Sequence, residues 1–239
     1  MNLALLCDHD FLEGNRVRLT GRRLEHLKTV IRATEGHRIP IGRENGLMGH
    51  GEVLTLTDTE AELRVELNQS PPPPLPLTLI LAMPRPKMLR RVLQTCAALG
   101  VKDIWLINSY KVEKSFWQTP WLSEENLREN LTLGLEQAKD TRMPRVHIRK
   151  LFKPFVEDEL PDLLAGTRAL VAHPGKAEAC PVHLTKPATL CIGPEGGFTD
   201  YEVGKLEEAG CTSVHLGPRI LRVETAVPVL ISRLFDTCG

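Results

Sequence analysis

The sequence predicts an α/β protein: a mostly parallel β-sheet with helices on both faces, preceded by a small β-barrel domain. After residue 76, short apolar runs alternate with stretches of helical periodicity, which is the pattern of β-α-β units. Before residue 70, most segments alternate apolar and polar residues, as strands with one exposed face do. Between these regions, Ser70–Pro76 contains five prolines, which lack the backbone donor that helices and strands need.

We therefore expect three parts along the chain. Residues 1–70 form the β-barrel domain, residues 71–76 a stiff proline-rich linker, and residues 77–239 the α/β domain. In the first part, Glu44–Gly46 is predicted to be the turn of a β-hairpin. Apolar residues at helical spacing around Leu27 predict one short amphipathic helix.

The α/β part is predicted to alternate strands and helices. Leu77–Met83 is apolar throughout, as expected of a strand that is buried on both faces of its sheet. Four further strands are expected at Asp103–Ile107, Arg168–Ala172, Thr189–Ile192 and Ser213–Leu216. Helices are expected from about Leu89 to Leu99, Ser123 to Lys139, Thr199 to Gly210 and Glu224 to Phe235. Thr199 and Glu202 form a capping box, which defines the start of the third of these helices.

The distribution of charge leaves two interpretations open. The chain has 30 basic and 30 acidic residues, so its zero net charge does not favour nucleic acid as a partner. However, residues 16–43 hold eight Arg or Lys against two Glu, and residues 139–153 hold six against one Asp. A protein with no net charge can therefore present a positive face, and an ordinary surface of mixed charge is the alternative.

Several classes of protein are not expected. The six cysteines are scattered and form no C-x-x-C pair, so we predict no metal site. No apolar run approaches the roughly 20 residues that cross a bilayer, so we predict no membrane partner. Residues 1–10 lack the basic start of a secretory signal, and a cytoplasmic location is therefore expected.

A glycine-rich segment, Ile192–Phe198, lies between an expected buried strand and an expected capped helix. Its three glycines permit positive φ angles and let a ligand approach the backbone closely. Loops at the carboxyl ends of parallel strands are where α/β sheets bind ligands. The segment is therefore a candidate ligand-binding loop, and the alternative is a tight turn without a ligand.

A second glycine-bearing segment, Leu216–Ala226, also follows an expected strand. It presents Arg219, Arg222, Glu224 and Thr225 ahead of an apolar helix. Arg222 and Glu224 could simply form an ion pair at the helix N-terminus, where Glu is favoured. Two polar, glycine-bearing loops after consecutive strands of one sheet instead favour a shared binding site.

These two segments together closely resemble the signature pair of the RsmE family, bacterial 16S rRNA uridine-N3 methyltransferases of the SPOUT superfamily. Supporting matches are Leu99–Val101, Glu136 and Gln137 with Arg142 and Pro144, and Leu27–Arg32. The resemblance spans nearly the whole chain. It implies a PUA-like N-terminal barrel, a trefoil knot in the C-terminal domain, a homodimer, S-adenosylmethionine as cofactor, and 16S rRNA or the small ribosomal subunit as partner.

The resemblance also implies which residues form the sites. Three loops are expected to wrap the cofactor through Ala172, His173, Ile192, Gly193, Pro194, Glu195, Gly196, Gly197, Leu216, Gly217, Ile220, Leu221, Arg222, Thr225 and Ala226. RNA is expected to contact the cations Arg16, Arg22, Arg23, Lys28, Arg32, Arg85, Lys87 and Arg142.

For catalysis, a positioned guanidinium would offset the negative charge that develops on uracil as N3 loses its proton. We expect Arg222 in this role, with Glu224 orienting it or assisting proton transfer and Thr225 hydrogen-bonding nearby. Two other functions remain open. One is methylation of a different RNA site or atom, such as a ribose 2′-hydroxyl. The other is a non-catalytic RNA-binding or ribosome-assembly factor.

Overall fold

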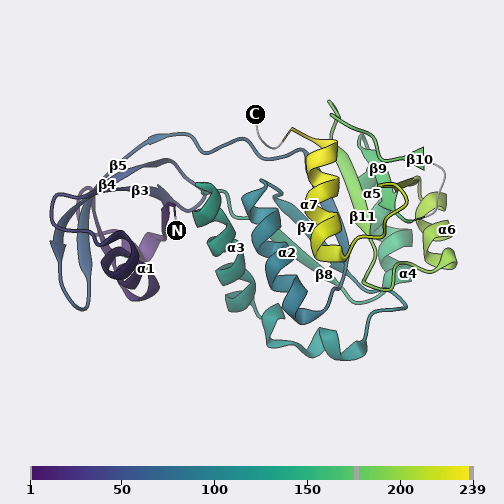
Figure 1. The fold of residues 1–239 in the computed structure, drawn as a ribbon, viewed down its shortest axis with the longest axis horizontal. Coiled ribbons are helices and arrows are strands. Elements are labelled where there is room, and N and C mark those ends of the chain that lie inside the picture. Colours follow the sequence, from purple (N-terminus) through teal and green to yellow (C-terminus); the bar gives the residue numbers. More distant parts are fainter. Residues whose placement is uncertain (1, 175–177, 237–239) are drawn as a thin grey trace. The chain divides into compact units, whose positions relative to one another are not determined.

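The computed structural model describes residues 2–174 and 178–236, and the chain divides into two compact units (Figure 1). Unit 1 comprises Met1–Pro73 with Thr132–Met143, and unit 2 comprises Pro74–Leu131 with Pro144–Gly239. The last three residues of the expected α/β domain lie outside the described part of the chain.

Unit 1 is built on one five-stranded sheet. Its strands are β1 (Ala4–Leu6), β2 (Arg16–Leu19), β3 (Arg38–Arg43), β4 (Met48–Leu56) and β5 (Ala61–Gln69). They are ordered β1-β3-β4-β5-β2, and every pair is antiparallel except β1 with β3. The short helical elements are η1 (Asp8–Asp10), α1 (Gly21–His26) and η2 (Leu27–Ile31). The expected helix and hairpin are therefore present.

The alternation of residues along these strands creates the core of unit 1. Val17 and Leu19 in β2 are fully buried, while Arg16 and Arg18, which alternate with them along the strand, are exposed. The same alternation buries Leu63 in β5. Because apolar side chains gain free energy when they leave water, this one-sided pattern fixes which face of the sheet turns inward.

A buried ion pair fastens the N-terminal segment of unit 1. The side chain of Asp10 is 3% exposed, and its two oxygens accept from Nη1 and Nη2 of Arg23, each at 2.6 Å. The same carboxylate accepts from the backbone N–H of Cys7 at 2.7 Å, and Arg23 also donates to the carbonyl of Leu5. Burial opposes the charge of Arg23, but the hydrogen bonds and the charge of Asp10 outweigh it and raise the pKa of Arg23.

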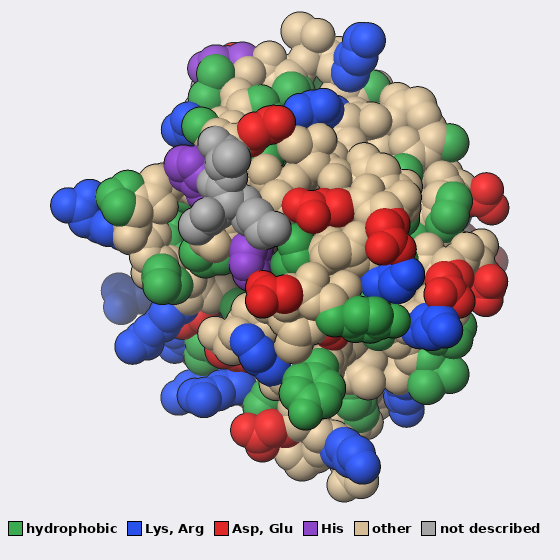
Figure 2. All heavy atoms as spheres, turned by 90° about the vertical axis from the view of Figure 1, so that its right-hand side faces the viewer, with side chains coloured by type: hydrophobic (Ala, Val, Ile, Leu, Met, Phe, Trp, Pro, Cys, Tyr) green, Lys and Arg blue, Asp and Glu red, His purple; other side chains and the backbone are tan. Residues whose placement is uncertain are grey.

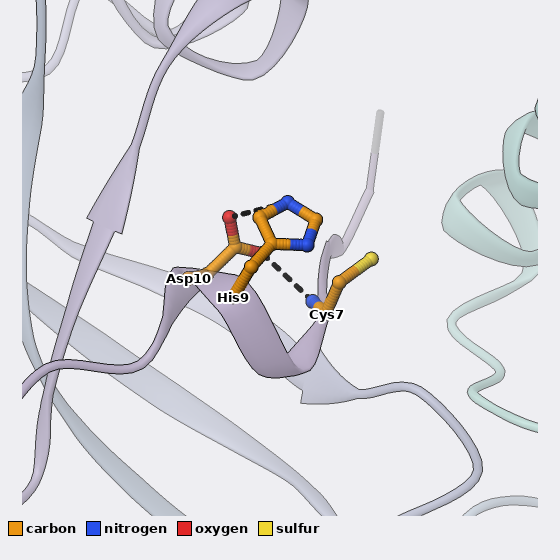
Figure 3. Close-up of side chains that lie close together, drawn as sticks. All are labelled: Cys7, His9 and Asp10. Carbon is orange, nitrogen blue, oxygen red and sulfur yellow. Dashed lines mark hydrogen bonds and ion pairs between the residues drawn. The ribbon is translucent and has the colours of Figure 1, made fainter.

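Asp10 of this ion pair and two neighbouring side chains are of the residue types that bind metal ions. Cys7, His9 and Asp10 bring one potential ligand atom each to within 4.8 Å of one another (Figure 3). Both oxygens of Asp10 are already bound by Arg23, so a cation would have to share the carboxylate with a guanidinium. We therefore interpret the group as part of the fold of unit 1.

The end of the long helix α3 (Glu124–Ala138) belongs to unit 1. Its Glu136 is 1% exposed, and the carbonyl of this residue accepts from the N–H groups of Asn2 and Leu3 at 3.0 and 3.1 Å. The carboxylate of Glu136 accepts from the N–H of Leu5 and pairs with Arg22. Residues 132–143 fall within the segment 77–239 that was expected as the second domain, but these bonds to the N-terminus group them with unit 1.

Unit 2 contains a seven-stranded sheet in which every pairing of the described residues is parallel. Its strands are β6 (Leu77–Ala82), β7 (Asp103–Ile107), β8 (Arg145–Arg149), β9 (Arg168–Ala172), β10 (Glu178–Ala179), β11 (Ala188–Ile192) and β12 (Thr212–His215). Their order is β10-β12-β9-β11-β6-β7-β8. The prediction of an α/β fold with a mostly parallel sheet is confirmed. The edge strand β8 was not predicted, because its three basic residues made it look like part of a charged segment.

The helices and short helical turns of unit 2 connect these strands. They are α2 (Pro86–Ala98), η3 (Lys114–Gln118), η4 (Pro120–Leu122), α4 (Phe152–Pro154), η5 (Phe155–Glu159), α5 (Leu160–Leu164), α6 (Asp200–Glu208) and α7 (Val223–Leu234). α7 packs beside α2, whereas α5 contacts β11 and α6 contacts β9 and β12 (Figure 1). The crossovers through α2 and through α6 run in opposite directions along the sheet. Because such crossovers are right-handed, they place helices on both faces.

Local sequence signals fix the ends of two of these helices. α2 stops where Gly100 adopts a φ of 85° and the N–H of Val101 bonds the carbonyl of Cys96, as at many glycine-terminated helices. α6 starts at the predicted capping box: Glu202 N–H donates to the Thr199 hydroxyl, and Thr199 N–H donates to the Glu202 carboxylate at 2.8 Å. The prediction for this helix is confirmed.

Asp10→Ala is expected to lower the free energy of unfolding by about 3–5 kcal/mol, because it leaves the guanidinium of Arg23 without its counter-charge. Urea denaturation followed by circular dichroism measures the change. Asp8→Ala is the matched control: the side chains of Asp8 and Arg43 form an ion pair but are 86% and 53% exposed. Its effect should stay within about 0.5 kcal/mol. Equal losses for the two variants would contradict this role for Asp10.

Candidate functional site

A cavity of about 640 Å³ opens at the carboxyl ends of three neighbouring strands of unit 2. Ala172 of β9 is in register with Ile192 of β11 and with Val214 of β12. The chain segments that follow these three strands therefore begin at the same edge of the sheet. All three segments line the cavity, which lies where parallel α/β sheets commonly bind ligands.

The structure brings most of the expected ligand-binding residues together around this cavity. Thirteen of the fifteen line it: Ala172, His173, Ile192, Gly193, Pro194, Glu195, Gly196, Gly197, Leu216, Gly217, Ile220, Leu221 and Ala226. Arg222 and Thr225 do not line it. Ten lining residues are not among the fifteen: Lys111, Pro174, Phe198, Thr199, Asp200, Val214, His215, Arg219, Val223 and Leu230. Of these, Phe198, Arg219 and Val223 lie within the two glycine-bearing segments that the sequence indicated, and Pro174 directly follows His173.

The glycine-rich loop after β11 is folded tightly on itself. The N–H of Gly197 donates to the carbonyl of Pro194 at 2.7 Å, and Gly197 has a φ of 69°. A Cβ atom at Gly193 would lie 2.8 Å from the backbone nitrogen of Phe198, closer than such contacts allow. A side chain at Gly193 would therefore push the loop open.

Two further bonds hold this loop from outside. The carboxylate of Glu195 accepts from the backbone N–H of Arg85, at the start of α2, at 2.9 Å. Nζ of Lys111, from the segment after β7, donates to the carbonyl of Gly196 at 2.8 Å. The loop is thus bonded to the segments that follow β6 and β7, the next two strands after β11 in the order of the sheet. These bonds restrict the motion of the loop even without a ligand.

The loop after β12 leads directly into α7. The N–H of Gly217 donates to Nδ1 of His215 at 3.0 Å, and Gly217 has a φ of 108°, which favours glycine. Ile220 is 81% exposed although it lines the cavity. The carbonyl of Arg222 accepts from the N–H groups of Thr225 and Ala226 and so begins the helix.

The three expected catalytic residues lie in the first turn of α7. Arg222 and Thr225 are exposed, and Glu224 is half-buried. Within the described part of the chain, Arg222 and Glu224 form no ion pair with each other or with another residue. The alternative interpretation of these two residues as a structural ion pair is therefore not supported. The guanidinium of Arg222 remains accessible to a ligand.

The cavity combines apolar walls with backbone polar groups. Ile192, Val214 and Leu230 supply aliphatic surface, whereas the glycine loops expose peptide groups. The charged residues of the lining are Lys111, Arg219, Glu195 and Asp200, two of each sign. The face of unit 2 over α6 and β10 likewise shows acidic and basic side chains intermixed (Figure 2). Such a site suits a flat, mostly uncharged group held by backbone hydrogen bonds.

The thiols next to this site are unsuited to nucleophilic chemistry. Cys191, which precedes Ile192, is fully buried, and its hydrogen bond with Cys211 and its burial raise its pKa well above the ordinary value. Burial likewise raises the pKa of Cys180. Thiols in this state stay protonated near neutral pH and are poor nucleophiles.

The eight cations expected to bind RNA fall into two groups. Four form ion pairs: Arg16 with Glu62, Arg22 with Glu136, Arg23 with Asp10 and Lys28 with Asp58, at 2.6–2.9 Å. The other four side chains, Arg32, Arg85, Lys87 and Arg142, are exposed and make no ion pair within residues 2–174 and 178–236. The second group is therefore the more accessible to phosphate.

No helix of the described chain is both long enough and apolar enough to span a bilayer.

Comparison with known proteins agrees with the resemblance seen in the motifs. Over 236 residues the chain is 28% identical to "Ribosomal RNA small subunit methyltransferase E" of Treponema pallidum, covering 95% of this chain and 87% of the relative. The protein of the same name from Synechocystis is 28% identical over 91% of this chain and 72% of its own length. The resemblance to the RsmE family is thus confirmed.

A solved structure has the same fold. The Ribosomal RNA small subunit methyltransferase E of Neisseria gonorrhoeae, bound to S-adenosyl methionine, superposes with a TM-score of 0.75, covering 97% of this chain and 95% of that one at 22% identity. The family model of the RNA methyltransferase domain matches residues 71–235. Since this match takes in the whole sheet of unit 2 and all three loops of the cavity, the chain belongs to the RNA methyltransferase domain family.

Proposed function

We propose that this protein transfers a methyl group from S-adenosylmethionine to N3 of a uridine in 16S ribosomal RNA. The observation that carries the proposal is the cavity at the ends of β9, β11 and β12, lined by both glycine-bearing motifs of the RsmE resemblance. The family match, the names of the relatives and the S-adenosyl methionine bound by the Neisseria gonorrhoeae protein support it.

The cavity has the properties that S-adenosylmethionine requires. Its volume of about 640 Å³ lies within the range of sites for ligands of this size. The aliphatic side chains of Ile192, Leu216 and Leu221 offer surface for an adenine ring. A Cβ atom at Gly197 or Gly217 would meet no atom within 4 Å, so the backbone there faces open space. Peptide groups of these loops would hold the polar edges of the cofactor.

When bound, S-adenosylmethionine supplies an activated methyl group. The residues of the protein must hold an unpaired uridine base of the RNA in the correct orientation and stabilise this base as its N3 proton leaves. The free guanidinium of Arg222 would offset the negative charge that spreads over N3 and the two carbonyl oxygens of uracil. Glu224 would orient Arg222 or take up the proton, and the hydroxyl of Thr225 would hydrogen-bond nearby.

We further propose the finer features of the fold that the resemblance implies. A trefoil knot in unit 2 is supported by α7, which follows β12 yet packs on α2, and by segment 180–184, which bonds the end of α7. Its bonds run from the N–H groups of His183 and Leu184 to the carbonyls of Arg233 and Leu234. We also propose that unit 1 is PUA-like, that the protein is a homodimer, and that it acts on ribosomal RNA in the cytoplasm.

RNA binding is proposed to depend chiefly on Arg32, Arg85, Lys87 and Arg142, whose side chains are not already neutralised by a carboxylate. Arg16, Arg22, Arg23 and Lys28 would have to exchange their partners for phosphate, which costs part of the gain from binding. Arg23 is the least suited of them, because its own side chain is only 15% exposed and its partner Asp10 is buried.

The purified protein is expected to methylate small ribosomal subunits, and nucleoside mass spectrometry of the digested RNA should show N3-methyluridine. Naked 16S rRNA assayed in parallel identifies the preferred substrate form. A ribose 2′-O-methyl product would instead support a different target atom. Binding of RNA without binding of S-adenosylmethionine in calorimetry would support a non-catalytic factor.

Gly193→Ala is expected to weaken binding of S-adenosylmethionine at least about tenfold, because the added Cβ forces the glycine loop away from Phe198. Isothermal titration calorimetry measures the affinity. Gly204→Ala is the matched control, since a Cβ there meets nothing within 4 Å and alanine favours the helix α6. Unchanged affinity in a folded Gly193→Ala protein would contradict the placement of the cofactor in this cavity.

Arg222→Ala is expected to lower kcat by about 100- to 1,000-fold, the usual cost of removing a donor that stabilises developing negative charge. Affinity for S-adenosylmethionine should change much less than kcat. Arg222→Lys should recover only part of the rate, since lysine lacks the planar fork of arginine. The proposed role fails if turnover of the alanine variant stays near that of the unmodified protein.

A further inference from the structure

A short turn after β7 presents two side chains at the edge of the cavity. The N–H of Val112 donates to the carbonyl of Ser109 at 3.0 Å, and both of these residues are buried. Between them, Tyr110 is 85% exposed and Lys111 is exposed. The turn is therefore fixed at both ends while its two central side chains point away from the core. Neither glycine-bearing motif includes it.

Hydrogen bonds tie this turn to the glycine-rich loop of the site. The backbone N–H of Tyr110 donates to Oε1 of Glu202 at 2.7 Å. Glu202 is 3% exposed, and its Oε2 accepts from the N–H of Thr199, which lines the cavity. The next residue, Lys111, lines the cavity itself and bonds the carbonyl of Gly196. The backbone of Tyr110 is thus held one residue from the cavity lining.

The exposed ring of Tyr110 contributes little to the fold. A tyrosine stabilises a protein mainly by burying its ring, and this ring remains in water. A single exposed aromatic side chain would be unremarkable on a free loop. Here the backbone of Tyr110 is anchored by a buried carboxylate beside a ligand cavity, so the attachment point of the side chain is held at the cavity edge although the ring has no part in the core.

The charges of the cavity indicate which part of an RNA the ring would contact. Lys111 and Arg219 are balanced by Glu195 and Asp200 in the lining. The face of unit 2 over α6 and β10 also carries side chains of both signs (Figure 2). The charged residues of the lining by themselves therefore give no net attraction for phosphate. Stacking of a base on an aromatic ring does not depend on net charge, and single-stranded RNA is commonly bound in this way.

We propose that Tyr110 is a stacking platform for a nucleobase of the RNA substrate, either the target uridine or its neighbour, at the edge of the cofactor cavity. The inference rests on the proposed RNA methyltransferase activity and adds a residue that positions the substrate. Lys111 would keep the turn and the glycine-rich loop together.

The test compares Tyr110→Ala and Tyr110→Phe in the full-length protein, saturated with S-adenosylmethionine. Small ribosomal subunits are the substrate for KM and kcat, and filter binding gives RNA affinity without requiring turnover. Tyr110→Ala is expected to raise KM and weaken RNA binding by about tenfold, the loss of one base–aromatic stack. Tyr110→Phe keeps the ring and should stay within about twofold of the unmodified protein. Calorimetry should give unchanged cofactor affinity for both variants.

Tyr201 provides the matched control, because it is the only other tyrosine, is 59% exposed, and lies on α6 near Lys205. Tyr201→Ala should leave KM and RNA affinity unchanged. The inference is overturned if Tyr110→Ala binds RNA normally, if Tyr110→Phe is as weak as Tyr110→Ala, or if Tyr201→Ala has the same effect. A protein that binds RNA through Tyr110 but transfers no methyl group would contradict the proposed function and leave the stacking role standing.

Discussion

Parallel pairing of β9 with β11 and with β12 is the constraint on which the site depends. In this arrangement Ala172, Ile192 and Val214 share one level of the sheet, and the three following segments start side by side. Residues more than forty positions apart in the sequence thereby surround one cavity. A slip of one residue in either pairing would turn the side chains of a strand to the opposite face and displace its loop. The chemistry proposed for the loops therefore rests on the apolar strands that carry them.

Buried carboxylates fix parts of the backbone in both units. Glu202 caps α6 and also holds the turn at Tyr110, so one side chain connects a helix start to a loop from another strand. In unit 1, Asp10 bonds Arg23 and the backbone of Cys7 in a similar way. Each of these carboxylates accepts more than one hydrogen bond, which compensates for the loss of water around it. Polar contacts that the hydrophobic pattern alone does not specify thus hold a segment at the cavity in unit 2 and the N-terminal segment in unit 1.

The sequence could predict those parts of the fold that depend on local signals. The sequence pattern located five strands of the sheet in unit 2 with small errors at their ends, and the capping box at Thr199 placed the start of α6. The strand β8 was not predicted, because an edge strand with alternating basic residues has no continuous apolar run. The attachment of residues 132–143 to unit 1 was not predicted either. It depends on hydrogen bonds between Glu136 and the N-terminal residues, which are far apart in the sequence and meet only in the folded chain.

For the site, the motifs and the family resemblance indicated thirteen lining residues. Lys111 could not be predicted, because its contact with Gly196 joins residues 85 positions apart in the sequence.

The central claim is that the loops after β11 and β12 close around a methyl donor. Amide hydrogen exchange with and without S-adenosylmethionine tests it most directly, since a bound ligand slows exchange where it restricts the backbone. We expect slower exchange in both 193–198 and 216–222 and no change in the glycine-containing strand β4 (Met48–Leu56). Unchanged exchange in these two loops at saturating S-adenosylmethionine would contradict the claim.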